Sequence, residues 1–243
     1  MITQEYTQEN VLITGAASGI GYAQMMAYLT AGANVIAIDK QKITLSHPKL
    51  TTYVVDLSDV TQMTTLLKDS ILQEIDVFLN TAGVLDAFTP ALETDYAKIQ
   101  KVMTVNVNAA IQLTLAILPG MVKRQKGEIV YMASIAGQVA GGGGAAYTTS
   151  KHALVGWMRQ LALDYAHDHI HINAIAPGAI KTPMNAADFA GDGSMAQSVA
   201  EQTPIQRWAQ PEEVANLTLY VTSPEASYMQ GQVLTLDGGW TLK

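Results

Sequence analysis

Short apolar runs alternate with longer helical patterns along the whole chain, and this alternation restricts the possible folds more than any other feature. Strands are expected at residues 10–14, 34–39, 51–55, 75–79, 128–133, 170–175 and 232–236, and helices at 19–30, 60–72, 96–125, 147–166 and 211–221. Pro119 is expected to end or bend the longest helix. No repeat or linker divides the sequence. The pattern therefore predicts one α/β domain over residues 1–243, a doubly wound parallel sheet of about seven strands with helices on both faces.

The composition favours a soluble protein with a large core. Of 243 residues, 49% are hydrophobic and 14% are charged, which leaves little material for disorder. The net charge of −7 argues against nucleic acid or an anionic membrane surface as the main partner. The absence of cysteine excludes disulfide and thiolate chemistry. No apolar run approaches the roughly 18 residues of a membrane span, and residues 1–5 do not begin a secretory signal, so a cytoplasmic location is expected.

Small residues join the first expected strand to the first helix, in Thr14-Gly15-Ala16-Ala17-Ser18-Gly19-Ile20-Gly21. Glycines let the backbone approach a pyrophosphate closely, and a helix start offers free N–H groups and the positive end of the helix dipole. Glycine-rich turns are common, so the position between strand and helix carries most of the signal. The segment predicts a dinucleotide site.

Two aspartates at later strand ends bear on which dinucleotide is bound. Asp39 ends the second strand, eighteen residues after Gly21. A carboxylate there can accept both ribose hydroxyls of NAD and would repel a 2′-phosphate. Ser18 offers such a phosphate no charge, although Lys40 weakens the preference. We expect NAD(H) to be preferred over NADP(H), with a surface-turn aspartate as the alternative for Asp39. Asp56 follows the third strand. Its side chain could contact the adenine of the dinucleotide, or it could belong to the turn that begins the next helix.

Tyr147 and Lys151 lie four residues apart, with Ser134 thirteen positions upstream. On a helix this spacing puts the phenol and the ammonium on one face. The ammonium would favour the phenolate and lower the tyrosine pKa toward the range of a general acid or base. Ser134 follows the 128–133 strand, at the carboxyl edge where α/β folds place ligands. By itself the pair also fits an exposed helical face, and the dinucleotide signal is what favours catalysis.

Together these motifs resemble the short-chain dehydrogenase/reductase family over essentially the whole chain, and are similar in particular to its 3-oxoacyl-(acyl-carrier-protein) reductases. The matching segments are Thr14-Gly15-x-x-x-Gly19-x-Gly21, Asn80-Thr81-Ala82-Gly83, Asn106, Ser134, Tyr147-x-x-x-Lys151, Pro177-Gly178 with Thr182, and Asp237-Gly238-Gly239. Each is weak alone, but their order and spacing make coincidence improbable. The family usually has asparagine where this chain has Thr81.

The resemblance implies a Rossmann fold and a set of site residues. Tyr147 would exchange a proton with the substrate oxygen, and Ser134 would hold that oxygen. Lys151 would lower the tyrosine pKa and bind the nicotinamide ribose. Asn106 would mark a helix kink that anchors a water leading from Lys151 to solvent. The resemblance thus assigns catalysis to Asn106, Ser134, Tyr147 and Lys151, no metal, and cofactor binding to Gly15, Ser18, Gly19, Ile20, Gly21, Asp39, Asp56, Leu57, Asn80, Ala82, Gly83, Tyr147, Lys151, Pro177, Gly178, Ile180 and Thr182.

The resemblance also implies a division of roles and an assembly. Residues 1–125 would mainly bind the dinucleotide, and residues 126–243 would carry the catalytic residues and the C-terminal strand. Apart from the resemblance, residues 183–204 are expected to form a long loop beside the site, rich in Ala, Asp, Gly and Met, and long loops in compact domains are often lids. A disordered insertion is the alternative for that lid. Family members are usually homotetramers, in which the helices that carry Asn106 and Tyr147 pair across one interface.

Two further clusters have plain explanations. The glycine run 141–144 could be a flexible connection or a floor along which substrate approaches the backbone. His167, His169 and His171 fit a helix end leading into a strand better than they fit a metal site.

The substrate class is argued from charge and from the expected pocket. Glu128 and Asp168 correspond to positions where carrier-protein reductases commonly have arginines near the site entrance, and carboxylates there would repel an acidic carrier. Residues 84–89, 138–146 and 184–195 are mainly small or apolar. We therefore expect an NAD-linked enzyme for a small secondary alcohol or ketone. Three alternatives stay open: a 3-oxoacyl-carrier or 3-oxoacyl-thioester reductase, a sugar or polyol dehydrogenase, and a non-catalytic dinucleotide-binding sensor.

Overall fold

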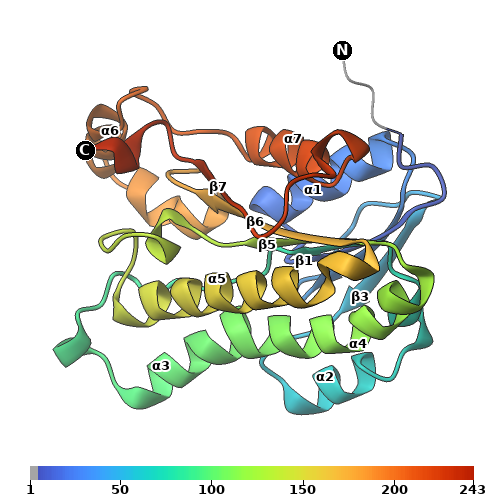
Figure 1. The fold of residues 1–243 in the computed structure, drawn as a ribbon. Coiled ribbons are helices and arrows are strands. Elements are labelled where there is room, and N and C mark those ends of the chain that lie inside the picture. Colours follow the sequence, from blue (N-terminus) through green and yellow to red (C-terminus); the bar gives the residue numbers. More distant parts are fainter. Residues whose placement is uncertain (1–4) are drawn as a thin grey trace.

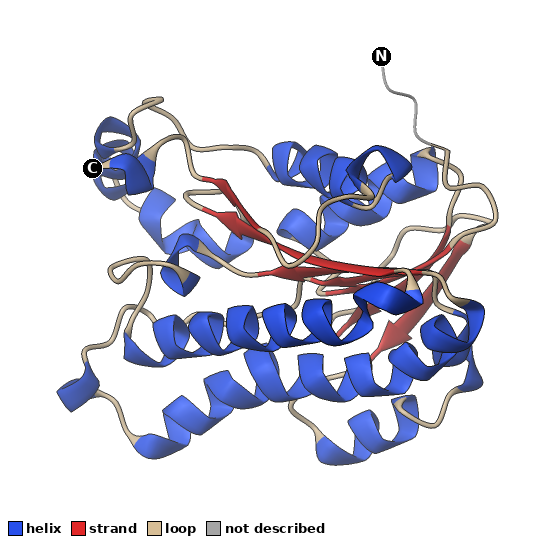
Figure 2. Ribbon diagram, viewed as in Figure 1, coloured by secondary structure: helices blue, strands red, loops and turns tan. Residues whose placement is uncertain are grey.

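A parallel sheet of seven strands, in the order β3-β2-β1-β4-β5-β6-β7, runs through the middle of the molecule (Figures 1 and 2). The computed structural model describes residues 5–243, so the expectation about a secretory signal lies almost wholly outside the described residues. The strands are β1 (Asn10–Thr14), β2 (Asn34–Asp39), β3 (Leu50–Val54), β4 (Val77–Asn80), β5 (Gly127–Met132), β6 (Ile170–Pro177) and β7 (Val233–Leu236).

The order of the strands confirms the predicted doubly wound sheet. The chain winds outward from β1 to β3 and then returns to place β4 beside β1. The direction of winding therefore reverses between β1 and β4. Such a reversal opens a crevice at the carboxyl ends of the strands, which is where open α/β sheets bind their ligands.

Successive residues of each strand face opposite sides of the sheet and build two cores. On one side Leu12 and Phe78 pack with residues of α2 (Val60–Leu66), α4 (Ala109–Arg124) and α5 (Ala145–Tyr165). On the other side Val11, Ile13 and Leu79 pack with α1 (Gly19–Thr30) and α7 (Pro211–Val221). Figure 1 shows these two helix layers with the sheet between them. Burial on both faces explains why the inner strands β1, β2, β4, β5 and β6 read as nearly continuous apolar runs, whereas the edge strand β3 is largely exposed.

One long helical stretch begins at α3 (Tyr96–Met103), passes through a π-helical segment (Thr104–Asn108) and continues as α4. Of the two effects expected of Pro119, an end of the helix is wrong, because α4 continues past it to Arg124. Pro119 lies on the exposed side of the helix, where water can solvate the carbonyl that its missing N–H leaves unpaired. The departure from α geometry lies instead in the π segment, which contains Asn106.

The same stretch, Tyr96–Arg124, is long and apolar enough by length and composition to cross a membrane. This corrects the expectation that no segment approaches such a span. In the structure 56% of its most apolar window is buried, and Leu113 and Ile117 are fully buried in the core. The core helix of a soluble protein has the same length and composition, and the burial agrees with that description.

Two other expected elements have different bounds. The 60–72 helix divides, because α2 ends at Leu66 and a 3-10 helix, η1 (Ser70–Glu74), follows. Residues 183–204 are not a loop, since they form η6 (Pro183–Phe189) and α6 (Ser194–Gln202). The remaining 3-10 helices are η2 (Ala91–Glu93), η4 (Ile135–Gly137), η5 (Ala166–Asp168), η7 (Pro224–Ala226) and η8 (Trp240–Leu242).

Candidate active site

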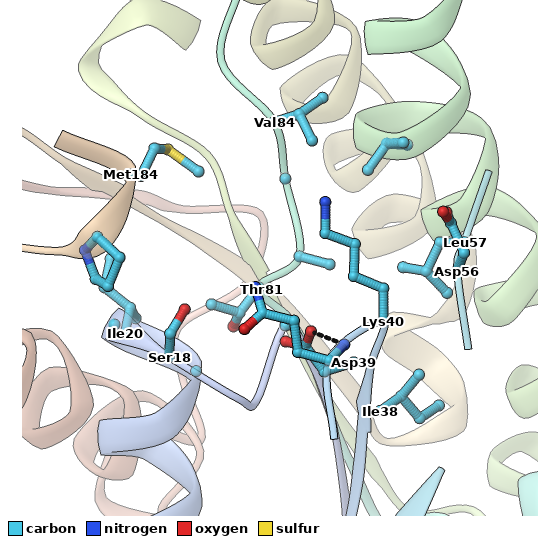
Figure 3. A pocket seen from close by; sticks show the side chains of 18 of the residues that line it. Ser18, Ile20, Ile38, Asp39, Lys40, Asp56, Leu57, Thr81, Val84 and Met184 are labelled. Carbon is cyan, nitrogen blue, oxygen red and sulfur yellow. Dashed lines mark hydrogen bonds between the residues drawn. The ribbon is translucent and has the colours of Figure 1, made fainter. Parts of the chain in front are cut away.

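A cleft with a cavity volume of about 300 Å³ lies at the carboxyl ends of β1, β2 and β4. Figure 3 shows Ser18 and Ile20 on one side of it, Asp56 and Leu57 on the other, and Lys40 between them. Most of the residues assigned to cofactor binding from the sequence line this cleft: Gly15, Ser18, Gly19, Ile20, Gly21, Asp39, Asp56, Leu57, Ala82, Gly83 and Thr182. Asn80 is buried at the end of β4 and lines neither this cleft nor the second cavity described below.

The turn between β1 and α1 needs its glycines for steric reasons. Gly15 has a φ of 72°, and a Cβ added there would lie 2.9 Å from Cα of Ala82. A Cβ on Gly21 would lie 2.2 Å from the Gly15 carbonyl oxygen. Ser18 occupies the N-cap position of α1 but its side chain makes no cap hydrogen bond. The first amides of this twelve-residue helix therefore lack a side-chain acceptor, and an anion such as a pyrophosphate fits there.

A threonine of β1 ties this turn to the loop after β4. The Thr14 hydroxyl accepts the N–H groups of Thr81 and Ala82, each at 3.1 Å. The Thr81 hydroxyl donates to Oε1 of Gln24 at 2.6 Å. The threonine that departs from the family pattern thus has a structural partner of its own, on α1.

Asp39 both holds a turn and lines the cleft. Its Oδ2 accepts the Ala17 N–H at 3.0 Å, and its Oδ1 accepts the Gln41 N–H at 2.8 Å. The negative charge therefore sits between the glycine-rich turn and the end of β2, facing the cleft. Asp56 likewise has two roles, because it lines the cleft and accepts the N–H and the hydroxyl of Ser58, hydrogen bonds that hold its pKa below the usual range.

A second cavity of about 120 Å³ adjoins the cleft and contains the expected catalytic groups. Ser134, Tyr147 and Lys151 line it together. The two cavities share the lining residues Ile20, Thr81, Gly83, Thr182 and Met184, so they are direct neighbours. The other residues of this cavity are Leu85, Phe88, Met132, Ala133, Gly142, Pro177, Gly178, Ile180 and Asn185.

Lys151 is buried beneath this cavity. Its ammonium donates to the Met132 carbonyl at 2.7 Å and lies 5.4 Å from the centroid of the Tyr147 ring. Burial disfavours the charged ammonium and lowers the pKa of Lys151 to about 8. Tyr147 and Lys151 therefore lie on one face of α5, as expected. The ammonium of Lys151 faces the ring of Tyr147 and bonds the Met132 carbonyl of β5.

The pKa of Tyr147 is raised in this structure, not lowered as the sequence suggested. Burial is the largest cause of the higher pKa, the Ser134 hydroxyl opposes it by hydrogen bonding, and the charge of Asp86 adds to it. The expectation neglected desolvation, which disfavours a phenolate as strongly as it disfavours an ammonium.

Asn106 is fully buried in the π segment and both ends of its amide are bonded. Its Oδ1 accepts the Val84 N–H at 2.8 Å, and its Nδ2 donates to the Val84 carbonyl and to the Ser150 hydroxyl, each at 3.0 Å. A Cβ added to Gly83 would lie 3.4 Å from Oδ1 of Asn106 and 3.6 Å from Nζ of Lys151. Asn106 and Lys151 thus approach the same point of the backbone, and π segments recur at functional sites.

The glycine run 141–144 has different tasks at its two ends. A Cβ at Gly141 would meet nothing within 4 Å. A Cβ at Gly143 would lie 2.4 Å from the Tyr147 ring, and one at Gly144 would lie 2.6 Å from the Asp86 carboxylate. Gly141 has a φ of 93°, a backbone conformation that favours glycine, whereas the later glycines are needed for close packing beside Tyr147 and Asp86.

Two contributors were missed from the sequence. Lys101, on α3, lines the cleft, and nothing in the spacing of α3 indicates this. Asp86 contacts the start of α5, and its signal was present as the one charged residue in the apolar stretch 84–89.

Glu128 and Asp168 do not lie at the site entrance, which corrects the sequence analysis. Glu128 is the second residue of β5, and Asp168 precedes β6. Both residues lie at the amino ends of parallel strands, whereas Ser134 follows a carboxyl end. Along β5, Glu128 is roughly 20 Å from Ser134. Glu128 accepts a hydrogen bond from His171 at 2.7 Å, and burial raises the pKa of Glu128 to about 6.

The histidines of this edge agree with the plain explanation. His167 lies in η5, His169 ends it with a φ of 58°, and His171 belongs to β6. Within residues 5–243, no three His, Cys, Asp or Glu side chains gather in a way that could hold a metal ion.

The chain is similar to proteins named as reductases and dehydrogenases. Residues 15–241 match the family model described as enoyl-(acyl carrier protein) reductase. The 3-oxoacyl-(acyl-carrier-protein) reductase FabG of Thermotoga maritima is 34% identical over 241 residues, which cover 94% of this chain and 96% of that protein. A putative NAD(P)-dependent gluconate 5-dehydrogenase of Beutenbergia cavernae, solved with bound NADP, is 34% identical with a TM-score of 0.90, covering 98% and 99% of the two chains. A 4-hydroxyisoleucine dehydrogenase complexed with NADH is 29% identical with a TM-score of 0.90, covering 97% and 100%.

Proposed function

The chain belongs to the short-chain dehydrogenase/reductase family, and on that premise we propose that it is an NAD(H)-dependent enzyme that interconverts a secondary alcohol and a ketone. One observation carries the proposal. Ser134, Tyr147 and Lys151 line a small cavity that adjoins a cleft suited to a dinucleotide and shares five lining residues with it. A binding protein without catalysis has no chemical need for these three groups together, which disfavours the sensor alternative.

Each side chain has a separate part in the proposed reaction. Tyr147 gives its proton to the carbonyl oxygen during reduction and takes a proton from the alcohol during oxidation. Ser134 donates a hydrogen bond to the same oxygen and fixes it beside the phenol. The bound nicotinamide would supply or accept the hydride.

Lys151 supports the phenolate by charge and by position. An ammonium has three N–H donors, and the Met132 carbonyl uses one of them. The two others are available for the nicotinamide ribose and for a water near Asn106. The positive charge of Lys151 also stabilises the phenolate that forms during turnover and so offsets the burial that raises the pKa of Tyr147.

The preference for NAD(H) rests on charge in the cleft. The Asp39 carboxylate would bind the ribose hydroxyls and repel a 2′-phosphate. Lys40 and Lys101 line the same cleft and reduce the size of this preference. The relatives differ here, since one structure holds NADP and another NADH.

The proposed substrate is a small ketone or alcohol with an apolar part. The apolar residues Leu85, Phe88, Ile180 and Met184 line the cavity together with Ser134 and Tyr147, and Asn185 is a polar neighbour. A second candidate is a 3-oxoacyl-thioester. The relative from Thermotoga maritima favours it, and the charge argument against an acidic carrier is removed because Glu128 and Asp168 lie at the opposite edge of the sheet.

The test is a panel of ketones and alcohols followed by the absorbance of NADH and, in parallel, NADPH. It should include short aliphatic ketones, diketones, acetoacetyl thioesters and polyols. We expect turnover with NAD(H) and a higher kcat/KM than with NADP(H), and we expect Asp39→Ala to reduce that difference. A natural preference for NADPH would refute the assignment of Asp39, and no turnover of any compound would refute the function.

We also propose that the protein is a soluble cytoplasmic homotetramer.

Residues 183–204 act as a lid in this proposal. The position of the segment supports this role, because Thr182 and Met184 border both cavities. The middle of this segment contacts Trp208, whose indole donates to the Ala196 carbonyl at 2.8 Å and whose ring lies 4.8 Å from that of Phe189.

A further inference from the structure

Asp86 lies in the loop after β4, and its carboxylate reaches the first turn of α5. Its Oδ1 accepts the Gly144 N–H at 2.8 Å, and its Oδ2 accepts the Tyr147 N–H at 2.9 Å. These amides belong to the N-cap and to the third residue of the helix, and Gly144 has no side chain with which to cap it. In a capping box, two side chains of the helix start accept the N–H groups of the N-cap and third residues. Here one carboxylate, 58 residues earlier in the chain, accepts both N–H groups.

The chain is shaped to receive this carboxylate. A Cβ on Gly144 would lie 2.6 Å from Oδ2 of Asp86, and a Cβ on Gly143 would lie 2.4 Å from the ring of Tyr147. Neither glycine has a positive φ, so backbone conformation does not demand them. Close approach of Asp86 and of the Tyr147 ring is the reason that glycine is needed at both positions.

The turn that carries Asp86 also forms part of the substrate cavity. The Asp86 carbonyl accepts two hydrogen bonds from Thr89, one from its N–H at 3.2 Å and one from its hydroxyl at 2.7 Å. Between them Ala87 and Phe88 have φ values of 54° and 57°, which is the pattern of a type I′ turn and is rare without glycine or asparagine. Phe88 lines the small cavity together with Ser134 and Tyr147. A strained turn is therefore held beside the reacting groups.

We propose that Asp86 is a positioning residue for Tyr147, because its carboxylate fixes the first turn of α5 against the turn that carries Phe88. The proposal rests on the proposed function, in which Tyr147 transfers the proton. Asp86 does not touch the substrate oxygen in this account. It sets where the phenol stands relative to Ser134 and to the wall of the cavity.

The same carboxylate affects how readily the phenol ionises. The charged groups near Tyr147 are Lys151 on its own helix and Asp86 on the loop after β4, while the segment after β5 contributes the neutral Ser134. A negative charge near the phenol opposes formation of the phenolate. The positive end of the α5 dipole favours the phenolate, and the Asp86 carboxylate offsets part of that effect. Asp86 therefore acts against Lys151, and its charge adds to the raised pKa of Tyr147.

Asp86→Asn tests this pairing, since the amide keeps the size of the side chain and removes the charge and one acceptor. We expect a lower kcat, and we expect the acid limb of the pH profile of kcat/KM for alcohol oxidation to move down by about half a unit to one unit. The matched control is Asp95→Asn, which removes the charge of the exposed aspartate that caps α3 and should leave the profile unchanged. An acid limb that stays in place or moves up in Asp86→Asn would overturn the proposal.

A second variant covers the case in which Asp86→Asn does not fold. Asp86→Glu keeps the charge but moves it by one methylene, so we expect a lower kcat with an acid limb close to that of the unmodified protein. A kcat equal to that of the unmodified protein would show that the position of this carboxylate is unimportant and would overturn the proposal.

A measurement without substrate separates this proposal from the proposed function. The ¹³Cζ resonance of Tyr147 in tyrosine-labelled protein reports its ionisation, and Tyr147→Phe identifies it. We expect its titration midpoint to be lower in Asp86→Asn than in the unmodified protein. If no substrate is turned over, the proposed function fails, but the titration still tests the role of Asp86. A titration midpoint that does not move in Asp86→Asn would reject that role.

Discussion

At the scale of single residues, burial changes the behaviour of both groups on which the proposed chemistry depends. It lowers the pKa of Lys151 to about 8 and raises the pKa of Tyr147. Each shift disfavours the charged form of its group. A phenolate and an ammonium stabilise each other in such a place, so the two groups should titrate as a coupled pair. The sequence identified the pair by its spacing, but it could not give these shifts, because they depend on groups distant in the chain such as Asp86.

The buried ammonium predicts how stability depends on pH. The pKa of Lys151 is about 8 in the folded protein and 10.5 when exposed, so the unfolded chain binds more protons between these values and stability rises with pH in that window. Lys151→Met cannot show this rise. We expect the difference in free energy of unfolding, unmodified protein minus Lys151→Met, to increase by roughly 2 kcal/mol from about pH 7.5 to about pH 9.5. Urea denaturation at the two pH values measures it, and a constant difference would show that Lys151 titrates like an exposed lysine.

At the scale of elements, the site depends on the places where regular structure is interrupted. The π segment presents Asn106 to the loop after β4, and that loop in turn caps α5 through Asp86. The strand and helix pattern could be predicted because each element has its own apolar period. The π segment and the cap could not, since both arise from contacts between segments. The error over Glu128 was avoidable, because the start of a parallel strand lies at the edge opposite the ligand crevice.

The start of α5 gives a prediction at this scale. Gly144→Ala puts a Cβ 2.6 Å from the Asp86 carboxylate, so the cap must move. We expect a loss of about 1–3 kcal/mol in the free energy of unfolding, of the size seen for overpacking, together with a lower kcat.

The control for this prediction is Gly156→Ala in the middle of the same helix. A Cβ there meets nothing within 4 Å, so we expect a gain of about 1 kcal/mol from helix propensity. Both values come from urea denaturation at one protein concentration. A neutral Gly144→Ala would mean that the contact with Asp86 is not needed to hold the helix start.

At the scale of the whole molecule, the proposed chemistry lies at one edge of the sheet, and the helix layers cover the two cores that stabilise it. The carboxyl ends of the strands gather the cleft and the small cavity, while the two cores fix the strands beneath them. The outer helices still expose large apolar side chains, with Leu115 of α4 at 56% and Leu163 of α5 at 76%. Such residues on neighbouring helices are a surface that a second copy of the chain could cover.

The exposed leucines predict the assembly. We expect a tetramer by size-exclusion chromatography with light scattering. Leu163→Glu should shift the mass toward dimer or monomer, because an unpaired carboxylate is costly at a covered apolar interface. The exposed Leu92, which lies on η2, supplies a control in Leu92→Glu that should not change the mass. A monomer for the unmodified protein would contradict the assembly and leave the site unaffected.

The most direct test of the account measures turnover and cofactor binding together in Tyr147→Phe. This variant keeps the ring and its packing and removes only the hydroxyl that is proposed to carry the proton. We expect NADH to bind with nearly unchanged affinity, as followed by its fluorescence, while kcat falls by about 10²- to 10⁴-fold. Turnover within a few fold of the unmodified protein would contradict the account, because the proton would then have to come from another group.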